Sequence, residues 1–262
     1  MEKRKPTYEL DSFKSEFCSV ERLRMTGTAR NTAFALGFVL QDVVDVIQAM
    51  TRQQFYKSMT SLADVKVWQD VYHVPYSGLV LYVKLTVDDE GKFAALLQGE
   101  MTMRTKAKNA KNATTKRCPE CGGAMRYETR ADRVEYKGKV RTFDTTAWWC
   151  DGCGESIQEG PALQAAERAF IELRAQVDDV LLPEEVAEVR EKLGISQREA
   201  GRVLGGGPRA FQKYESGKVP VSGPMKNLLV LLDNDPKRLR ELRAQPPRPR
   251  GRRKGTSAPT AT

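Results

Sequence analysis

The sequence of 262 residues has little histidine and no long hydrophobic run. His73 is the single histidine, so the chain cannot build a catalytic zinc site from several histidines and an open position for water. No apolar stretch approaches the roughly 20 residues that a membrane-spanning helix needs. The first five residues, Met1 to Lys5, are mostly polar. We therefore expect no secretory signal peptide and predict a cytoplasmic protein without membrane contact.

Cysteine is also scarce, at five residues, but four of the five form two identical C-x-x-C motifs. They are Cys118, Cys121, Cys150 and Cys153. Each motif can turn both sulfurs toward one point, and two motifs complete the tetrahedral shell of a closed structural zinc site. The sequence therefore predicts one structural Zn²⁺ per chain, in a ribbon domain of residues 118–160. The alternatives are paired disulfides, a redox C-x-x-C motif and the iron site of a rubredoxin-like electron carrier; disulfides rarely persist in a reducing cytoplasm.

The formal net charge of +9 is unevenly distributed along the chain. Residues 1–98 carry 12 basic and 12 acidic side chains, whereas residues 99–117 carry 6 and 1, and residues 236–262 carry 9 and 1. The excess therefore belongs to a basic linker over residues 99–117 and to the C-terminal end. Nucleic-acid binding can be argued only for local patches and not for a whole domain.

Hydrophobic periodicity predicts an α+β domain over residues 1–98. Helices are expected over residues 11–18, 29–35 and 42–50. Thr51 begins a further turn that leads into residues 55–59. Period-two alternation predicts antiparallel strands over residues 65–72, 79–87 and 92–97, the last after a turn at residues 88–91.

The second half of the chain predicts two further folded units. Strands are expected over residues 126–134 and 139–149 around Lys137-Gly138, and Pro161 opens a connector helix within residues 161–182. Residues 183–244 then predict an all-α helix-turn-helix domain. Gly194 ends one of its helices, and Ser196 with Glu199 forms a capping box for the next. Residues 245–262 have the composition of a disordered basic tail.

Three stretches of the first domain resemble the MqsR toxin family, messenger-RNA-cutting ribonucleases (mRNA interferases) of RelE-like fold. They are residues 55–60, 67–72 and 82–87. The resemblance implies a metal-independent endoribonuclease with Lys57, Gln69 and Tyr82 as catalytic residues. It also places Met59, His73 and Lys84 near the RNA. By composition alone, such residues more often serve packing or a solvated surface.

The C-terminal domain resembles XRE-type helix-turn-helix proteins, and its pairing with a C-x-x-C ribbon resembles the MqsA antitoxin family over residues 116–243. The resemblance implies that Arg209 and Lys213 contact DNA in the major groove, where an arginine reads guanine through two hydrogen bonds. Gln197 at a helix start is expected to contact a phosphate or a base, and Arg198 or Arg202 to contact a phosphate. The alternative for these side chains is a solvated helix face.

These features together predict an α+β multidomain chain that joins a toxin to its antitoxin. We expect a latent mRNA interferase held inactive by the zinc-binding half, which also binds operator DNA as a repressor and forms a homodimer through the C-terminal domain. The toxin–antitoxin contact can form within one chain or between two. The alternative is a DNA-binding transcription regulator whose N-terminal domain is catalytically dead and only binds a partner.

Overall fold

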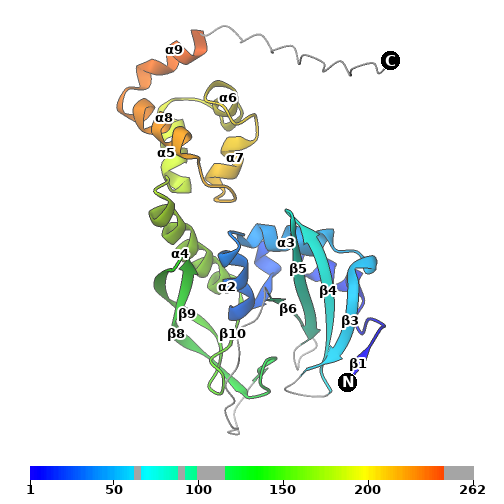
Figure 1. Ribbon diagram of the computed structural model, residues 1–262. Helices are drawn as coiled ribbons and strands as arrows, with labels where there is room; N and C mark the ends of the chain where they lie inside the picture. The colour runs from blue at the N-terminus through cyan, green and yellow to red at the C-terminus, as the bar shows by residue number, and fades with distance from the viewer. Residues whose placement is uncertain (62–65, 88–91, 99–115, 245–262) are drawn as a thin grey trace, which may run out of the picture.

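A computed structural model describes residues 1–61, 66–87, 92–98 and 116–244 (Figure 1). The expected turn at residues 88–91, most of the expected linker and the basic tail lie outside the described residues. In Figure 1 the N-terminal strands and helices lie beside a long hairpin, and a cluster of short helices sits at the far end of helix α4.

The N-terminal region contains the three expected helices and the three expected strands. The helices are α1 (Leu10–Glu16), α2 (Gly27–Ala35) and α3 (Leu40–Ala49). The three expected strands are β4 (Trp68–Tyr76), β5 (Leu79–Val87) and β6 (Phe93–Gln98). Three further strands are β1 (Glu2–Lys3), β2 (Arg24–Thr26) and β3 (Phe55–Thr60). The turn expected at Thr51 is confirmed as a short 3-10 helix, Arg52–Gln54. The residues that follow it form strand β3, which the alternation analysis did not find.

The strands belong to one sheet of ten strands, which is larger than the expected N-terminal sheet. Its order is β1-β3-β4-β5-β6-β2-β10-β9-β8-β7, where β7 (Lys116–Arg117), β8 (Ala124–Tyr136), β9 (Lys139–Cys150) and β10 (Ser156–Glu159) come from the second half of the chain. Strand β2 pairs in parallel with β6 on one side and antiparallel with β10 on the other. Because β10 follows the second C-x-x-C motif, the sheet runs from the N-terminal region into the ribbon without interruption.

The ribbon is a long hairpin with two short strands and a covering helix. It comprises β7 (Lys116–Arg117), β8 (Ala124–Tyr136), β9 (Lys139–Cys150), β10 (Ser156–Glu159) and α4 (Pro161–Asp178). The hairpin turn at Lys137-Gly138 is confirmed by its positive φ angles, and the last two residues of the expected linker form β7. The apolar face of α4 lies in the same core as α2 and α3, where the rings of Phe34 and Phe170 stack with centroids 4.5 Å apart.

The C-terminal helices have a core of their own. They are α5 (Pro183–Lys192), α6 (Gln197–Val203), α7 (Ala210–Glu215), α8 (Gly223–Asn234) and α9 (Leu239–Ala244). Half of the expected capping box is present, since the Ser196 hydroxyl accepts a hydrogen bond from the backbone of Glu199, whereas the Glu199 carboxylate pairs with Arg243. Helix α6 packs against the following turn so closely that a Cβ on Gly201 would lie 2.0 Å from the carbonyl oxygen of Gly207.

Within the described residues, no single helix has both the length and the apolar character that crossing a membrane requires. The bent pair α2 and α3 passes that test only when the two helices are taken together. Most of the large apolar side chains of this pair lie in the core, which explains their hydrophobicity.

Candidate functional site

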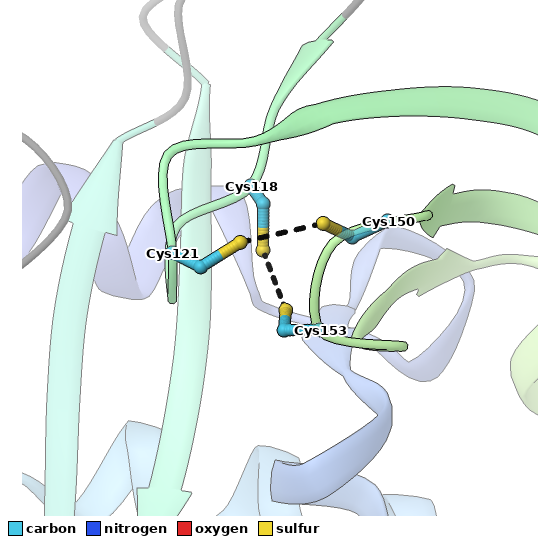
Figure 2. Close-up of side chains that lie close together, drawn as sticks. All are labelled: Cys118, Cys121, Cys150 and Cys153. Carbon is cyan, nitrogen blue, oxygen red and sulfur yellow. Dashed lines mark hydrogen bonds between the residues drawn. The ribbon is translucent and has the colours of Figure 1, made fainter. Parts of the chain in front are cut away.

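The four cysteines of the two motifs form a compact cluster at the end of the hairpin (Figure 2). Their sulfur atoms all lie within 4.8 Å of one another. The Cys118 and Cys153 sulfurs are 3.6 Å apart, and those of Cys121 and Cys150 are 3.4 Å apart. A tetrahedral zinc with Zn–S bonds of about 2.3 Å separates its sulfur ligands by about 3.8 Å. The arrangement therefore fits a four-thiolate zinc site and is too wide for disulfides.

The two motifs reach this geometry through the same backbone turn. In the first, Cys118 exchanges backbone hydrogen bonds with Gly122 and Gly123; in the second, Cys150 does so with Gly154 and Glu155. Gly122 and Gly154 have φ angles of 72° and 74°, a conformation in which glycine carries no steric cost. The repeated turn explains why two identical sequence motifs direct their sulfurs to one point.

The thiols of the cluster differ in their pKa values. A hydrogen bond between Cys118 and Cys153 raises the pKa of Cys118, and the same bond lowers the pKa of Cys153 to about 5. Burial raises the pKa of Cys121 to about 11. Cys153 is thus favoured as a thiolate, whereas Cys118 and Cys121 favour the protonated form, so zinc would have to displace the protons of these two thiols.

The six expected toxin residues lie on one face of strands β3, β4 and β5. They are Lys57, Met59, Gln69, His73, Tyr82 and Lys84. The register supports this placement because Met59 pairs with Gln69, and His73 pairs with Tyr82. Directly paired residues in adjacent strands point to the same side of a sheet. The opposite face packs against α1 and α3, so the six residues share the side away from these helices. Their roles stay predictions.

A cluster of three aromatic rings crosses this face, in which His73 stacks on Tyr56 with an interplanar angle of 23° and is tilted by 58° against Tyr82. The His73 ring lies between Tyr56 and Tyr82, with centroid distances of 4.3 and 4.4 Å. Both tyrosines are exposed, at 53% and 43%, so their outer surfaces are open to a nucleobase. Sequence analysis did not select Tyr56. Tyr56 lies in a register irregularity between Phe55 and Lys57, where the regular pairing of β3 with β4 is interrupted.

Lys57 and Gln69 differ in accessibility on this face. The Lys57 ammonium forms an ion pair with Glu2 of β1 at 2.8 Å. The hydrogen bond that Lys57 donates to Glu2 raises the pKa of Lys57, so the amine is protonated at neutral pH. Gln69 is buried, at 6% exposed, and only a small part of its side chain can reach a ligand.

The contact between the N-terminal region and the ribbon is built around a buried arginine. Arg30 of α2 is completely buried and forms an ion pair with Asp132 of β8. It also donates hydrogen bonds to Gln158 of β10 and to the backbone oxygen of Arg133. Burial opposes ionisation of Asp132, but the hydrogen bond and charge of Arg30 prevail and lower its pKa. The N-terminal region and the ribbon are therefore joined by the buried Arg30–Asp132 ion pair as well as by the continuous sheet.

Further polar contacts join the same two halves at their periphery. Glu155 accepts hydrogen bonds from Thr28, Glu159 pairs with Arg24, and Glu167 accepts from the backbone of Leu40. A contact from the C-terminal helices is also present, since Lys218 pairs with Asp45 of α3. The N-terminal region therefore contacts the hairpin, the connector helix and the loop after α7.

Most of the expected DNA contacts are exposed on the C-terminal helices. Arg198, Arg202, Arg209 and Lys213 are open to solvent. The exception, Gln197, donates its side-chain amide to Glu215, which also pairs with Arg190. Gln197 therefore holds α6 against the end of α7, and a base contact would require it to give up this hydrogen bond. The DNA contacts of these side chains stay predictions.

Comparison with known proteins matches two different families, one after the other along the chain. Residues 5–98 match the family described as "Motility quorum-sensing regulator, toxin of MqsA", and residues 116–243 match "Antitoxin component of bacterial toxin-antitoxin system, MqsA". The Antitoxin MqsA of Escherichia coli (strain K12) is 38% identical over 133 residues, which cover 48% of this chain and 99% of the relative. The mRNA interferase toxin MqsR of the same organism is 36% identical over 87 residues, covering 33% and 88%.

Proposed function

Because the chain belongs to the MqsR toxin family over its N-terminal part and to the MqsA antitoxin family over its C-terminal part, we propose that it is a self-inhibited mRNA interferase. The observation that carries this proposal is the pairing of β10 with β2, which joins antitoxin to toxin in one sheet. Inhibition then acts within a single chain. A toxin tethered to its inhibitor also cannot escape by dilution.

Cleavage would proceed on the face of β3–β5 without a metal. RNA hydrolysis through the 2′-hydroxyl needs a group that accepts the hydroxyl proton, a charge that stabilises the phosphate and a proton for the leaving oxygen. Lys57 supplies the positive charge, Gln69 orients the phosphate or the nucleophile, and solvent water accepts the proton of the 2′-hydroxyl. Tyr82 protonates the leaving oxygen or stacks on a base. Tyr56 and His73 extend the stacking surface for single-stranded RNA.

Latency is best explained by steric exclusion of mRNA at the edge of this face, where the zinc ribbon lies against the end of β3. The antitoxin residues that the structure describes leave Tyr56 and Tyr82 open, so the centre of the face is accessible. At the end of β3, however, the Ser61 hydroxyl donates to the backbone oxygen of Pro119 in the first cysteine turn, at 3.2 Å. An mRNA that continues along β3 beyond Met59 would meet the zinc ribbon there, whereas a short oligonucleotide would fit.

Limited trypsin treatment tests the proposed latency. The segment between Arg104 and Lys111 is rich in lysine and poor in apolar residues, so cleavage is expected there first. We expect two fragments that stay associated on size exclusion, and mRNA cleavage only after the antitoxin fragment is degraded. Lys57→Ala should give the same fragments without activity. If the untreated chain cleaves mRNA in a Lys57-dependent manner, the proposed latency is wrong.

The helix-turn-helix half is proposed to bind operator DNA as a dimer and to repress transcription. The exposed Arg209 at the start of α7 and Lys213 one turn later support this proposal. An arginine at such a position can read guanine through two hydrogen bonds, and Arg198 is available for a phosphate. Dimerisation through the C-terminal helices would place two such helices on one palindrome.

Arg209→Ala is expected to relax sequence preference, because it removes a base contact worth about 1–3 kcal/mol. Removal of residues 245–262 should instead weaken binding to every sequence equally and reduce the salt dependence, since the tail carries only nonspecific charge. Competition binding with a selected operator and with random DNA separates the two effects. Equal loss on both DNAs for Arg209→Ala would show that Arg209 does not read bases.

A further inference from the structure

Strand β1 places a carboxylate on the lysine that the proposed reaction needs. Glu2 pairs with Met59 in the register of β1 and β3, so its side chain shares the face of Met59 and Lys57. Its carboxylate lies 2.8 Å from the Lys57 ammonium. The hydrogen bond from Lys57 also lowers the pKa of Glu2, so the carboxylate is charged at neutral pH. Glu2 thus holds the position that a phosphate oxygen of bound RNA would take.

The segment around β1 is anchored away from this face. Lys3, which pairs with Ser58, has its ammonium 4.3 Å from the Trp68 ring centre. Beyond β1, the backbone amides of Thr7 and Tyr8 donate to the buried carboxylate of Asp70 at 2.8–3.0 Å. These contacts hold the segment on the face of the sheet opposite Lys57. The Glu2 side chain can therefore leave Lys57 while the segment stays bound.

We propose that strand β1 is an autoinhibitory strap in which Glu2 competes with an RNA phosphate for Lys57. The inference rests on the proposed ribonuclease function. An ion pair with exposed partners adds little to folding stability, and the Glu2 side chain is 57% exposed. The larger effect of the Glu2–Lys57 pair is therefore on RNA binding, because an incoming phosphate must first displace the negatively charged Glu2 carboxylate from Lys57. The match to the toxin family begins at residue 5, so β1 lies outside the matched region.

RNA affinity of the full-length chain tests the strap. The probe is a short single-stranded oligonucleotide of mixed sequence with 2′-O-methyl riboses, which cannot be cleaved because the nucleophilic hydroxyl is blocked. At low salt, Glu2→Gln should tighten binding about two- to fivefold, the range expected for an exposed charge pair. The control Glu21→Gln removes the same charge from the exposed 3-10 helix Val20–Arg22 and should leave the affinity unchanged. In a Lys57→Ala background, Glu2→Gln should also have no effect.

The outcomes separate the strap from the function on which it rests. Tighter binding by Glu2→Gln that disappears without Lys57 supports the strap. Unchanged or weaker binding by Glu2→Gln, in a chain whose affinity still depends on Lys57, overturns the strap and leaves the RNA face standing. Equal tightening by Glu21→Gln would make the effect one of net charge and overturn the strap as well. If Lys57→Ala alone does not change the affinity, the RNA face and the strap both fail.

Discussion

Cys118→Ser is expected to abolish zinc binding and to unfold the ribbon. The buried apolar cluster at the cysteine turns is small, consisting of Cys118, Met125, Cys150 and Ile157 with Trp148 packed against it. Structural zinc sites of this type contribute about 10–16 kcal/mol to folding. Because β10 follows directly after the Cys153 turn and pairs with β2, loss of the metal should also separate β10 from the toxin.

Zinc content and hydrogen exchange measure these two effects. The unmodified chain should hold one zinc per chain, and Cys118→Ser none. Backbone amides of β8, β9 and β10 should lose protection, whereas those of α5–α8 should keep it, because these helices have a separate core. Cys18→Ser is the matched control, since Cys18 is an exposed thiol outside the cluster. Zinc retained in Cys118→Ser, or an unchanged exchange pattern, would contradict the assignment.

The elements that sequence analysis found are those with a long local pattern. Helix α3 repeats apolar residues at helical spacing over ten residues, and strands β8 and β9 flank a turn with glycine. The short strands β2 and β10 have three and four residues, too few to display alternation. They become strands only because they pair with each other and with β6 and β9. The continuous sheet is therefore a tertiary property that no local window contains.

The candidate sites, like the fold, were predictable where they depend on local sequence motifs and not where they depend on long-range contacts. The cysteine cluster follows from two repeated motifs, and the common face of Lys57, Gln69 and Tyr82 follows from strand register once β3 is known. The ion pair of Lys57 with Glu2 joins residues 55 positions apart, and that of Arg30 with Asp132 joins residues 102 apart. Charged residues at such separations have many equivalent partners in the sequence. Only the fold selects one of them.

Asp132→Ala is expected to weaken the toxin–antitoxin contact strongly. Arg30 has no exposed surface, and its other hydrogen-bond acceptors in the described structure, Asn31, Gln158 and the backbone of Arg133, carry no charge. Removal of the carboxylate leaves a buried cation without its counter-ion, a change that costs about 3–5 kcal/mol. Asp144→Ala is the matched control, because Asp144 is an exposed aspartate that lies opposite Ala131 on the same hairpin.

The functional consequence of Asp132→Ala is release of the toxin without proteolysis. The intact variant should cleave mRNA in a Lys57-dependent manner, whereas Asp144→Ala should remain silent. Replacing both members of the pair, as Arg30→Met with Asp132→Leu, should restore latency, because an apolar pair of similar size no longer buries an unpaired charge. Chemical denaturation should follow the same order, with Asp132→Ala the least stable. If Asp132→Ala is as stable and as silent as the control, the buried pair does not hold the antitoxin in place, and latency must depend on the zinc ribbon at the rim of the RNA face.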